Sequence, residues 1–178
     1  LTKTGKTLSI GLTAPIVAFA AVSVKAFSDF EKELSKIEGL VGVAGPEVSK
    51  MGDGALEMAS KFGKTSTEVA EALFYITSAG LRGKDAMDVL EQSLKASVIG
   101  LGETKVIADL ATSSMNAYGS DVLSAANATD ILTAAVREGK LDASSLGGAM
   151  GAILPIASAM GVKFHEVGAA FAAMSRTG

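Results

Sequence analysis

The sequence predicts an all-α protein, a multi-helix array of about seven to nine helices. Apolar residues recur three and four positions apart, which is the spacing of one helix face, and glycine or proline interrupts these stretches about every twenty residues. The alternation of β-branched and polar residues that is typical of strands is lacking. Of the 178 residues 48% are hydrophobic, but only 5% are aromatic and 20 are glycine. Such a mixture favours helices that pack closely through small side chains.

The first helix is expected to begin at Thr13, a good helix-capping residue, with Pro15 in its first turn and Gly39 at its end. Its second half is amphipathic, because apolar residues between Phe27 and Ile37 alternate at helical spacing with acidic residues and lysines. A loop is expected at residues 39–46. Further helices are expected at residues 48–62, 65–80, 84–98, 104–118, 120–138 or 124–138, 144–160 and 164–175.

Two of these helix starts differ in their capping residues. Thr65 and Glu68 form a predicted capping box, in which the hydroxyl and the carboxylate each accept a hydrogen bond from a backbone amide. The residues in the same place before the last helix, Lys163 to His165, offer no evident side-chain cap. The start of that last helix is therefore not fixed by the sequence.

A sequence pattern recurs at a constant offset of 98 between residues 59–80 and residues 157–178. In each copy Ala-Ser-x-x-Gly ends one apolar stretch and Glu-Val-x-x-Ala opens the next, which predicts a duplicated helix-turn-helix unit. The second copy stops at its last glycine, so we expect a fragment that is truncated within its second repeat. The residues predicted to form a helix-packing or oligomer face are Phe62, Val69, Leu73, Ile76, Val167, Phe171 and Met174.

Two windows, Thr7 to Val24 and Ala143 to Val162, contain no charged residue and are long enough to be transmembrane candidates. Their glycine, proline and serine content favours buried helices over permanent spans, and leaves open a conditional insertion into membranes. Gly147 and Gly151 have the spacing of a close helix crossing. The candidate membrane-interacting residues are Ile16, Val17, Phe19, Ile153, Leu154 and Ile156.

The sequence contains no convincing catalytic, cofactor or metal motif. Cysteine is absent, which excludes thiolate chemistry, and the one histidine, His165, lies at a helix start where a surface role is expected. The carboxylates between Asp29 and Glu38 lie among lysines and read as a solvated helix face. A net charge of −3 gives no basic surface for nucleic acid. We therefore expect a non-enzymatic protein without cofactors and without sequence-specific nucleic-acid binding.

One resemblance rests on an ordered series of motifs. The run from Lys61 to Gly83, followed by Ala86 to Ser97, resembles the core region of phage tail tape measure proteins. Residues 13–42 resemble the entry to that region and residues 110–162 resemble its later part, so that the resemblance covers the chain from about residue 5 onward. It implies an N-terminal apolar and amphipathic helix at residues 1–45 and a tape measure core helical region at residues 46–178.

The resemblance also implies a structural function. Tape measure proteins occupy the lumen of the tail tube, set tail length during assembly in the host cytoplasm, and leave ahead of the genome at infection. Some help to form a route across the host envelope. The implied location is the virion tail, and the implied partners are the tail tube protein, tail tip or baseplate proteins, other copies of the chain in the tube, and the host membrane.

Two other classes remain open at the level of the sequence. A membrane-active or pore-forming helical protein without a phage role would also carry uncharged helices. A hydrolase acting on cell-wall glycans, a domain found within some tape measure proteins, would need a buried glutamate in a cleft, and no candidate stands out. Several hundred further codons of helical sequence downstream of residue 178 would favour a tape measure protein, whereas an early stop would favour a toxin.

Overall fold

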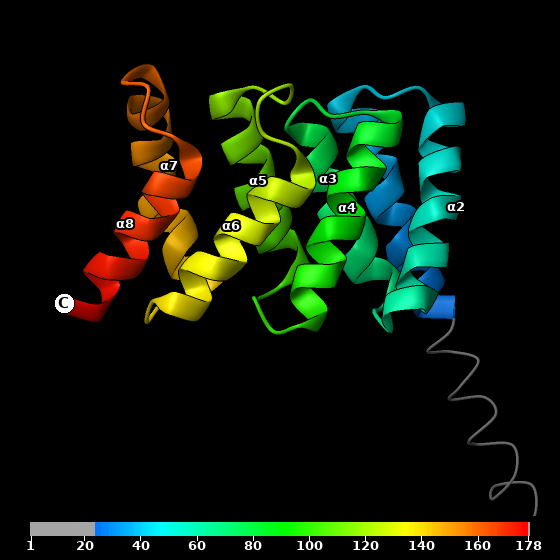
Figure 1. Cartoon of the computed structure of the whole chain (residues 1–178). Helices are drawn as coiled ribbons and strands as arrows, with labels where there is room; N and C mark the ends of the chain where they lie inside the picture. The colour runs from blue at the N-terminus through cyan, green and yellow to red at the C-terminus, as the bar shows by residue number, and fades with distance from the viewer. Residues whose placement is uncertain (1–23, 178) are drawn as a thin grey trace, which may run out of the picture.

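The structure is a computed structural model that describes residues 24–177, and every regular element in that range is a helix (Figure 1). The prediction of an all-α multi-helix array is confirmed. The expected cap at Thr13 and the proline at position 15 lie outside the described residues. The helices are residues 24–41, α2 (Gly45–Phe62), α3 (Ser66–Ser78), α4 (Gly83–Val98), α5 (Thr104–Tyr118), α6 (Ala125–Glu138), α7 (Ala143–Ala159) and α8 (Phe164–Thr177).

The largest departure from the predicted boundaries is the first loop. It was expected over residues 39–46, but the first helix continues through residue 41 and α2 already begins at Gly45. Pro46 lies in the first turn of α2, where its missing amide hydrogen would have had no helical partner anyway. The connection shrinks to three residues and includes Gly42 in the left-handed region, with φ 74°.

The helices from α2 onward form two rows. Helices α3, α5 and α7 contact one another in that order, and α2, α4, α6 and α8 contact one another in the same way in the second row (Figure 1). The first residues of α3, α5 and α7 are 38 and 39 positions apart. The architecture is therefore an array of helix pairs, in which each pair packs mainly against its neighbours.

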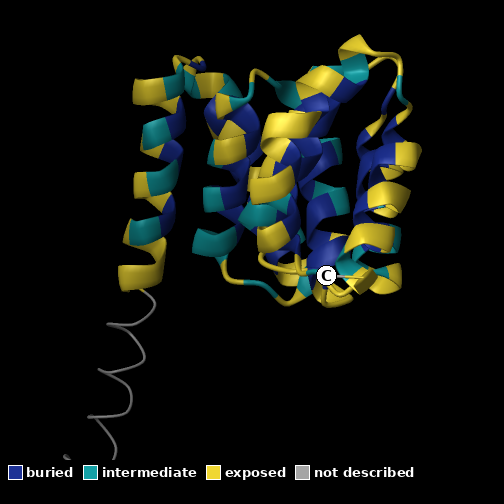
Figure 2. Ribbon diagram, turned by 90° about the vertical axis from the view of Figure 1, so that its left-hand side faces the viewer, coloured by how far each residue is buried: buried dark blue, intermediate teal, exposed yellow. Residues whose placement is uncertain are grey.

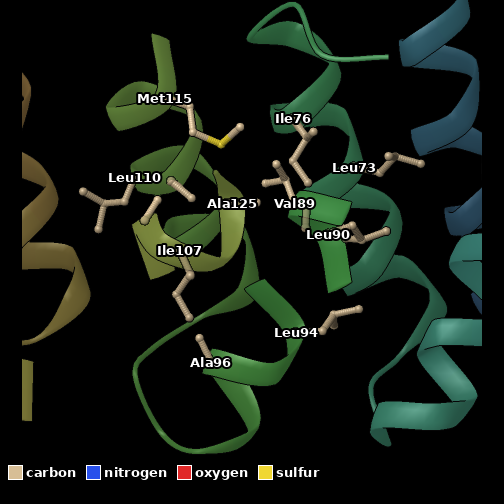
Figure 3. Close-up of a cluster of buried hydrophobic side chains, with 14 of the residues drawn as sticks. Leu73, Ile76, Val89, Leu90, Leu94, Ala96, Ile107, Leu110, Met115 and Ala125 are labelled. Atoms are coloured by element: carbon tan, nitrogen blue, oxygen red, sulfur yellow. The ribbon is translucent and has the colours of Figure 1, made fainter. Parts of the chain in front are cut away.

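One hydrophobic cluster runs through the array between the rows (Figure 2). Leu73 and Ile76 of α3, Leu90 of α4 and Ile107 of α5 meet in its middle, and none of these side chains is exposed to solvent (Figure 3). Phe30, in the helix of residues 24–41, belongs to the same cluster. Small side chains fill much of the remaining interface, as the composition predicted: Ala55, Ala70, Ala72, Ala86, Ala108, Ala111 and Ala128 have no solvent exposure.

The duplicated turn is present in both predicted copies with the same geometry. The glycine of each turn, Gly63 or Gly161, has a positive φ of 65° or 75°. The amide of the following residue donates to the carbonyl oxygen of the alanine five positions earlier, Ala59 or Ala157, at 2.9 Å in both. This pair of features is a Schellman motif, which satisfies the free carbonyls at a helix end.

A third copy of this turn follows α4 and was missed in the sequence. The segment Ala96-Ser97-x-x-Gly100 has the same pattern, the amide of Leu101 donates to the Ala96 oxygen at 3.0 Å, and Gly100 has φ 91°. Its next helix begins one residue later than in the other copies, which hides the match. The pattern at offset 98 therefore marks a recurrent helix-ending turn, and its two predicted copies lie in opposite rows of the array.

Candidate functional site

The predicted packing face of the first repeat lies in the core. Val69, Leu73 and Ile76 are fully buried between α3 and its neighbours (Figure 3), and Phe62, at the end of α2, is partly buried against the same cluster. This half of the predicted face therefore contacts other helices of the same chain.

The corresponding face of the second repeat lies at the end of the array, and it is only partly covered. Val167 and Phe171 are 5% and 8% exposed, whereas Met174 is 56% exposed. Met174 was expected on the same face, but α8 has no following helix in the described residues to cover its last turns.

The capping box at the start of α3 is only half formed. The Thr65 hydroxyl accepts a hydrogen bond from the Glu68 amide at 3.2 Å, as predicted. The Glu68 carboxylate instead accepts from the hydroxyl of Thr104 at 2.7 Å, at the first residue of α5, and pairs with Lys64 at 3.0 Å. The residue expected to cap its own helix thus joins two helices of one row.

The start of α8 uses the other half of the box. The sequence showed no cap there, but the Glu166 carboxylate accepts a hydrogen bond from the backbone amide of Lys163 at 2.8 Å. This contact is the carboxylate half of a capping box without its hydroxyl partner. It fixes the boundary that the sequence left open.

Charged groups fix the register of α3 against α5. Lys105 of α5 lies 3.0 Å from the Glu71 carboxylate of α3, and this hydrogen bond raises the pKa of Lys105 above its ordinary value. On the neighbouring row Lys61 of α2 lies 3.0 Å from Glu91 of α4, and the hydrogen bond from Lys61 lowers the pKa of the Glu91 carboxyl. Both pairs are partly exposed, so that each contributes register more than stability.

Successive helices of the α3–α5–α7 row are also tied by a side chain that donates to a backbone carbonyl near the end of its neighbour. Asn116 of α5 donates through Nδ2 to the Ala79 oxygen that follows α3, at 3.1 Å. Ser158 of α7 donates through Oγ to the Ala117 oxygen of α5, at 2.7 Å. The same device thus recurs from one helix pair to the next.

Helix α7 is the element in which a large apolar surface faces solvent. It buries one narrow stripe, Ala143, Leu146, Met150, Leu154 and Ala157. Its remaining surface includes Ile153, Ile156 and Met160, which are 40%, 60% and 76% exposed. We name as the α7 outer face the exposed residues Ala149, Ala152, Ile153, Ile156 and Met160.

The sequence-based expectation that this whole uncharged window is shielded from solvent is wrong. Of the candidate membrane-interacting residues in it, Leu154 lies in the core, while Ile153 and Ile156 lie on the outer face. Within residues 24–177, no helix combines the length and the apolar character that a membrane crossing needs. The other candidates, Ile16, Val17 and Phe19, lie outside the described residues.

The two glycines of α7 that were expected to form a close crossing have different surroundings. A Cβ added at Gly147 would lie 3.5 Å from the Leu110 side chain of α5, so Gly147 lies at a helix–helix contact. A Cβ added at Gly151 would meet nothing within 4 Å. The close crossing therefore involves Gly147, and Gly151 lies on the open side of α7.

A cavity of about 560 Å³ lies where α5, α6 and α8 meet, and His165 is part of its lining. The Tyr118 hydroxyl points into buried space without a hydrogen-bond partner, and burial raises the pKa of Tyr118. The Tyr118 ring contacts that of Phe164, with 5.5 Å between their centroids. Neither a cysteine nor a second histidine exists to pair with His165, so this lining offers no nucleophile and base couple. Among the described residues no cluster of carboxylates and imidazoles is suited to a metal.

Helix pairs without a catalytic centre, and an apolar face at one end, define a class of structural, assembly-forming helical proteins. The sequence profile of the phage-related minor tail protein family matches residues 52–178, and the chain belongs to this family. It is 26% identical over all 178 residues to "Tape measure protein" of Pneumococcus phage Dp-1 and 25% identical over 168 residues to "Probable tape measure protein" of Clostridium phage phiCD119. The resemblance to tape measure proteins is thereby confirmed.

The matched region is a small part of each relative. The chain covers 16% of the Dp-1 protein and 18% of the phiCD119 protein, while 100% and 92% of the chain are aligned. No solved structure matches the chain significantly. What the whole relatives do is therefore a matter for the proposal that follows.

Proposed function

We propose that this chain is a folded module of a phage tail tape measure protein, and that the parent protein determines tail length through segments outside this module. The likeness to two tape measure proteins over nearly the whole chain carries the first half of the proposal. The array of short helices carries the second half, because a ruler has to be extended.

The physical argument concerns length. A continuous helix rises about 1.5 Å per residue, so 178 residues as one rod would span roughly 270 Å. The described helices are 13 to 18 residues long and separated by turns, and their apolar faces cover one another. Straightening them would expose that core to water, at a cost of about 25 cal/mol per Å² of apolar surface. A folded module is therefore the more stable state of this segment.

In the tail the proposed partners are the tail tube protein, the tip or baseplate proteins and other copies of the parent chain. We propose that residues 1–45 form its entry segment and residues 46–178 its core. We also propose that the protein leaves ahead of the DNA at infection. At that stage the uncharged windows, including the α7 outer face, would meet the host membrane.

An in-frame deletion of residues 60–178 in the phage gene tests the length argument. We expect impaired assembly or genome delivery in particles whose surviving tails keep their normal length by electron microscopy. Tails shorter by roughly 180 Å, the rise of the lost residues as continuous helix, and otherwise infectious, would show that this segment is itself a ruler.

Dye release from anionic lipid vesicles tests the membrane step separately. The chain is compared with a variant carrying Val17→Asp and Ile153→Asp, since a charge in each window opposes insertion. We expect the chain to release dye and the variant to release much less. Equal release from both, or none from either, would remove the membrane step and leave the structural role intact.

A further inference from the structure

The α7 outer face occupies the place where the array would continue. In the row α3–α5–α7, helix α5 is covered on both sides, by α3 and by α7. Helix α7 is covered by α5 on one side only, and none of the described residues packs on the other. Figure 1 shows α7 and α8 together at one end of the array.

Position by position, the α7 outer face is the counterpart of a buried face. Leu110 of α5 lies against Gly147 of α7, and the Ala117 carbonyl accepts the Ser158 hydroxyl, so these residues mark the side of α5 that faces α7. Alignment of the first residues of the two helices, at 104 and 143, places Leu110 on Ala149, Ser114 on Ile153 and Ala117 on Ile156.

The same register also describes the helix before. A shift of 38 positions, between the first residues of α3 and α5, places Leu110 on Ala72, Ser114 on Ile76 and Ala117 on Ala79. Ala72 and Ile76 are fully buried, and the Ala79 carbonyl accepts the Asn116 amide of α5. In both earlier helices of the row this face is therefore the one that receives the next helix.

The composition of the outer face fits such an occupant. It combines two isoleucines and a methionine with alanines, and the whole of α7 contains no charged residue. A solvated surface helix would carry charge there, as α5 carries Asp109 on its exposed side. The last unit of a finished helix array needs a polar outer face, and α7 lacks one.

We infer that the α7 outer face is the docking site for a further helix of the parent polypeptide, in the position that follows α7 in its row. The occupant comes from the same chain, because the matched relatives are about six times longer than the aligned region and the array repeats every 38 to 39 residues. The occupant should present small and aliphatic side chains toward Ile153 and Ile156. The inference is independent of any role in the tail.

Thiol labelling tests it, because the chain contains no cysteine. Ile156→Cys is made in the 178-residue chain and in a chain extended by about 40 residues of its own gene, one further helix pair. Labelling by a maleimide should be fast in the former and slower by at least about tenfold in the latter, since packing must open before reaction. The matched control, Ser113→Cys on the exposed side of α5, should label at the same rate in both.

Three outcomes would overturn the inference. Equal rates for Ile156→Cys in the two chains would show that the following segment does not cover the face. Slowing of the 178-residue chain with rising concentration, together with a dimer by light scattering, would assign the face to a second copy. Slow labelling of the 178-residue chain at every concentration would assign it to another part of that same chain.

Discussion

Helices α5 and α7 occupy successive places in one row, yet they treat solvent differently. Helix α5 exposes only a narrow polar stripe, Asp109, Ser113 and Asn116. Helix α7 is more apolar and exposes more of its surface, including Ile153 and Ile156. The comparison teaches that burial in such an array follows from the number of neighbouring helices, since each helix receives cover from the pair before it and the pair after it.

The largest test of this comparison truncates the same side chain in both helices. Ile107 of α5 is fully buried, so Ile107→Ala should lower the free energy of unfolding by about 2–5 kcal/mol through lost burial and a residual cavity. Ile156 of α7 is 60% exposed, and Ile156→Ala should change it by no more than about 0.5 kcal/mol. Urea unfolding followed by circular dichroism measures both.

The contrast between these two variants is the decisive quantity. A loss of 2 kcal/mol or more for Ile156→Ala would mean that the α7 outer face is already covered in this chain. Unfolding in two separated steps would mean that α7 and α8 melt apart from the rest, and each step would then need its own analysis.

A smaller effect is expected where glycine is replaced in covered and open helices. Gly151→Ala should raise the free energy of unfolding by about 0.5–1 kcal/mol, because alanine is the better helix former and the new Cβ meets open space. Gly168 of α8 is the matched control. A Cβ there would lie 2.9 Å from Cγ2 of Ile131, a stiff β-branched side chain in α6.

Gly168→Ala should therefore lower stability, because the overpacking cost of about 1–3 kcal/mol exceeds the gain in helix propensity. Thermal melts of both variants against the parent chain give the two signs. Stabilisation by both substitutions would show that α6 and α8 can move apart without cost. Destabilisation by both would place an unseen neighbour next to Gly151.

The sequence predicts the helices well and their neighbours poorly. Glycine turns and apolar spacing located every helix from α2 to α8 to within a few residues, because those signals are local. The first loop was placed too long, since Pro46 was interpreted as a loop residue although the first turn of a helix accepts it. The fate of Glu68, which bonds to Thr104 of another helix, depends on tertiary contacts that no local pattern contains.

The candidate surface shows the same division. Absence of charge singled out the window that contains α7, but not which of its sides is covered, because periodicity is weak in a helix that is apolar almost all round. The offset of 98 drew attention to one recurrent turn and away from the shorter spacing of 38 to 39 residues between helices of a row. Aligning helix starts, and not identical residues, would have pointed to Ile153 and Ile156.

The smallest expected effect concerns how the two helices begin. Asp142 caps α7: its Oδ1 accepts a hydrogen bond from the Ser145 amide at 2.7 Å, and this contact lowers the pKa of the Asp142 carboxyl. The residue before α5, Glu103, makes no side-chain cap. A lowered pKa in the folded state means that the charged cap contributes stability above the unfolded-state pKa of about 4, and that this contribution is lost as the pH falls through the lower folded-state value.

Asp142→Asn keeps a capping side chain but removes its titration. The parent chain should be more stable than Asp142→Asn at pH 7, and this difference should shrink as the pH falls below about 4. Asp142→Ala, which removes the cap as well, should remain less stable than Asp142→Asn at every pH. Urea unfolding of the three chains between pH 7 and pH 2.5 measures both differences. A difference between the parent and Asp142→Asn that stays constant over this range would show that the charge of Asp142 contributes nothing to the start of α7, and that the two helices of the row begin equally well without it.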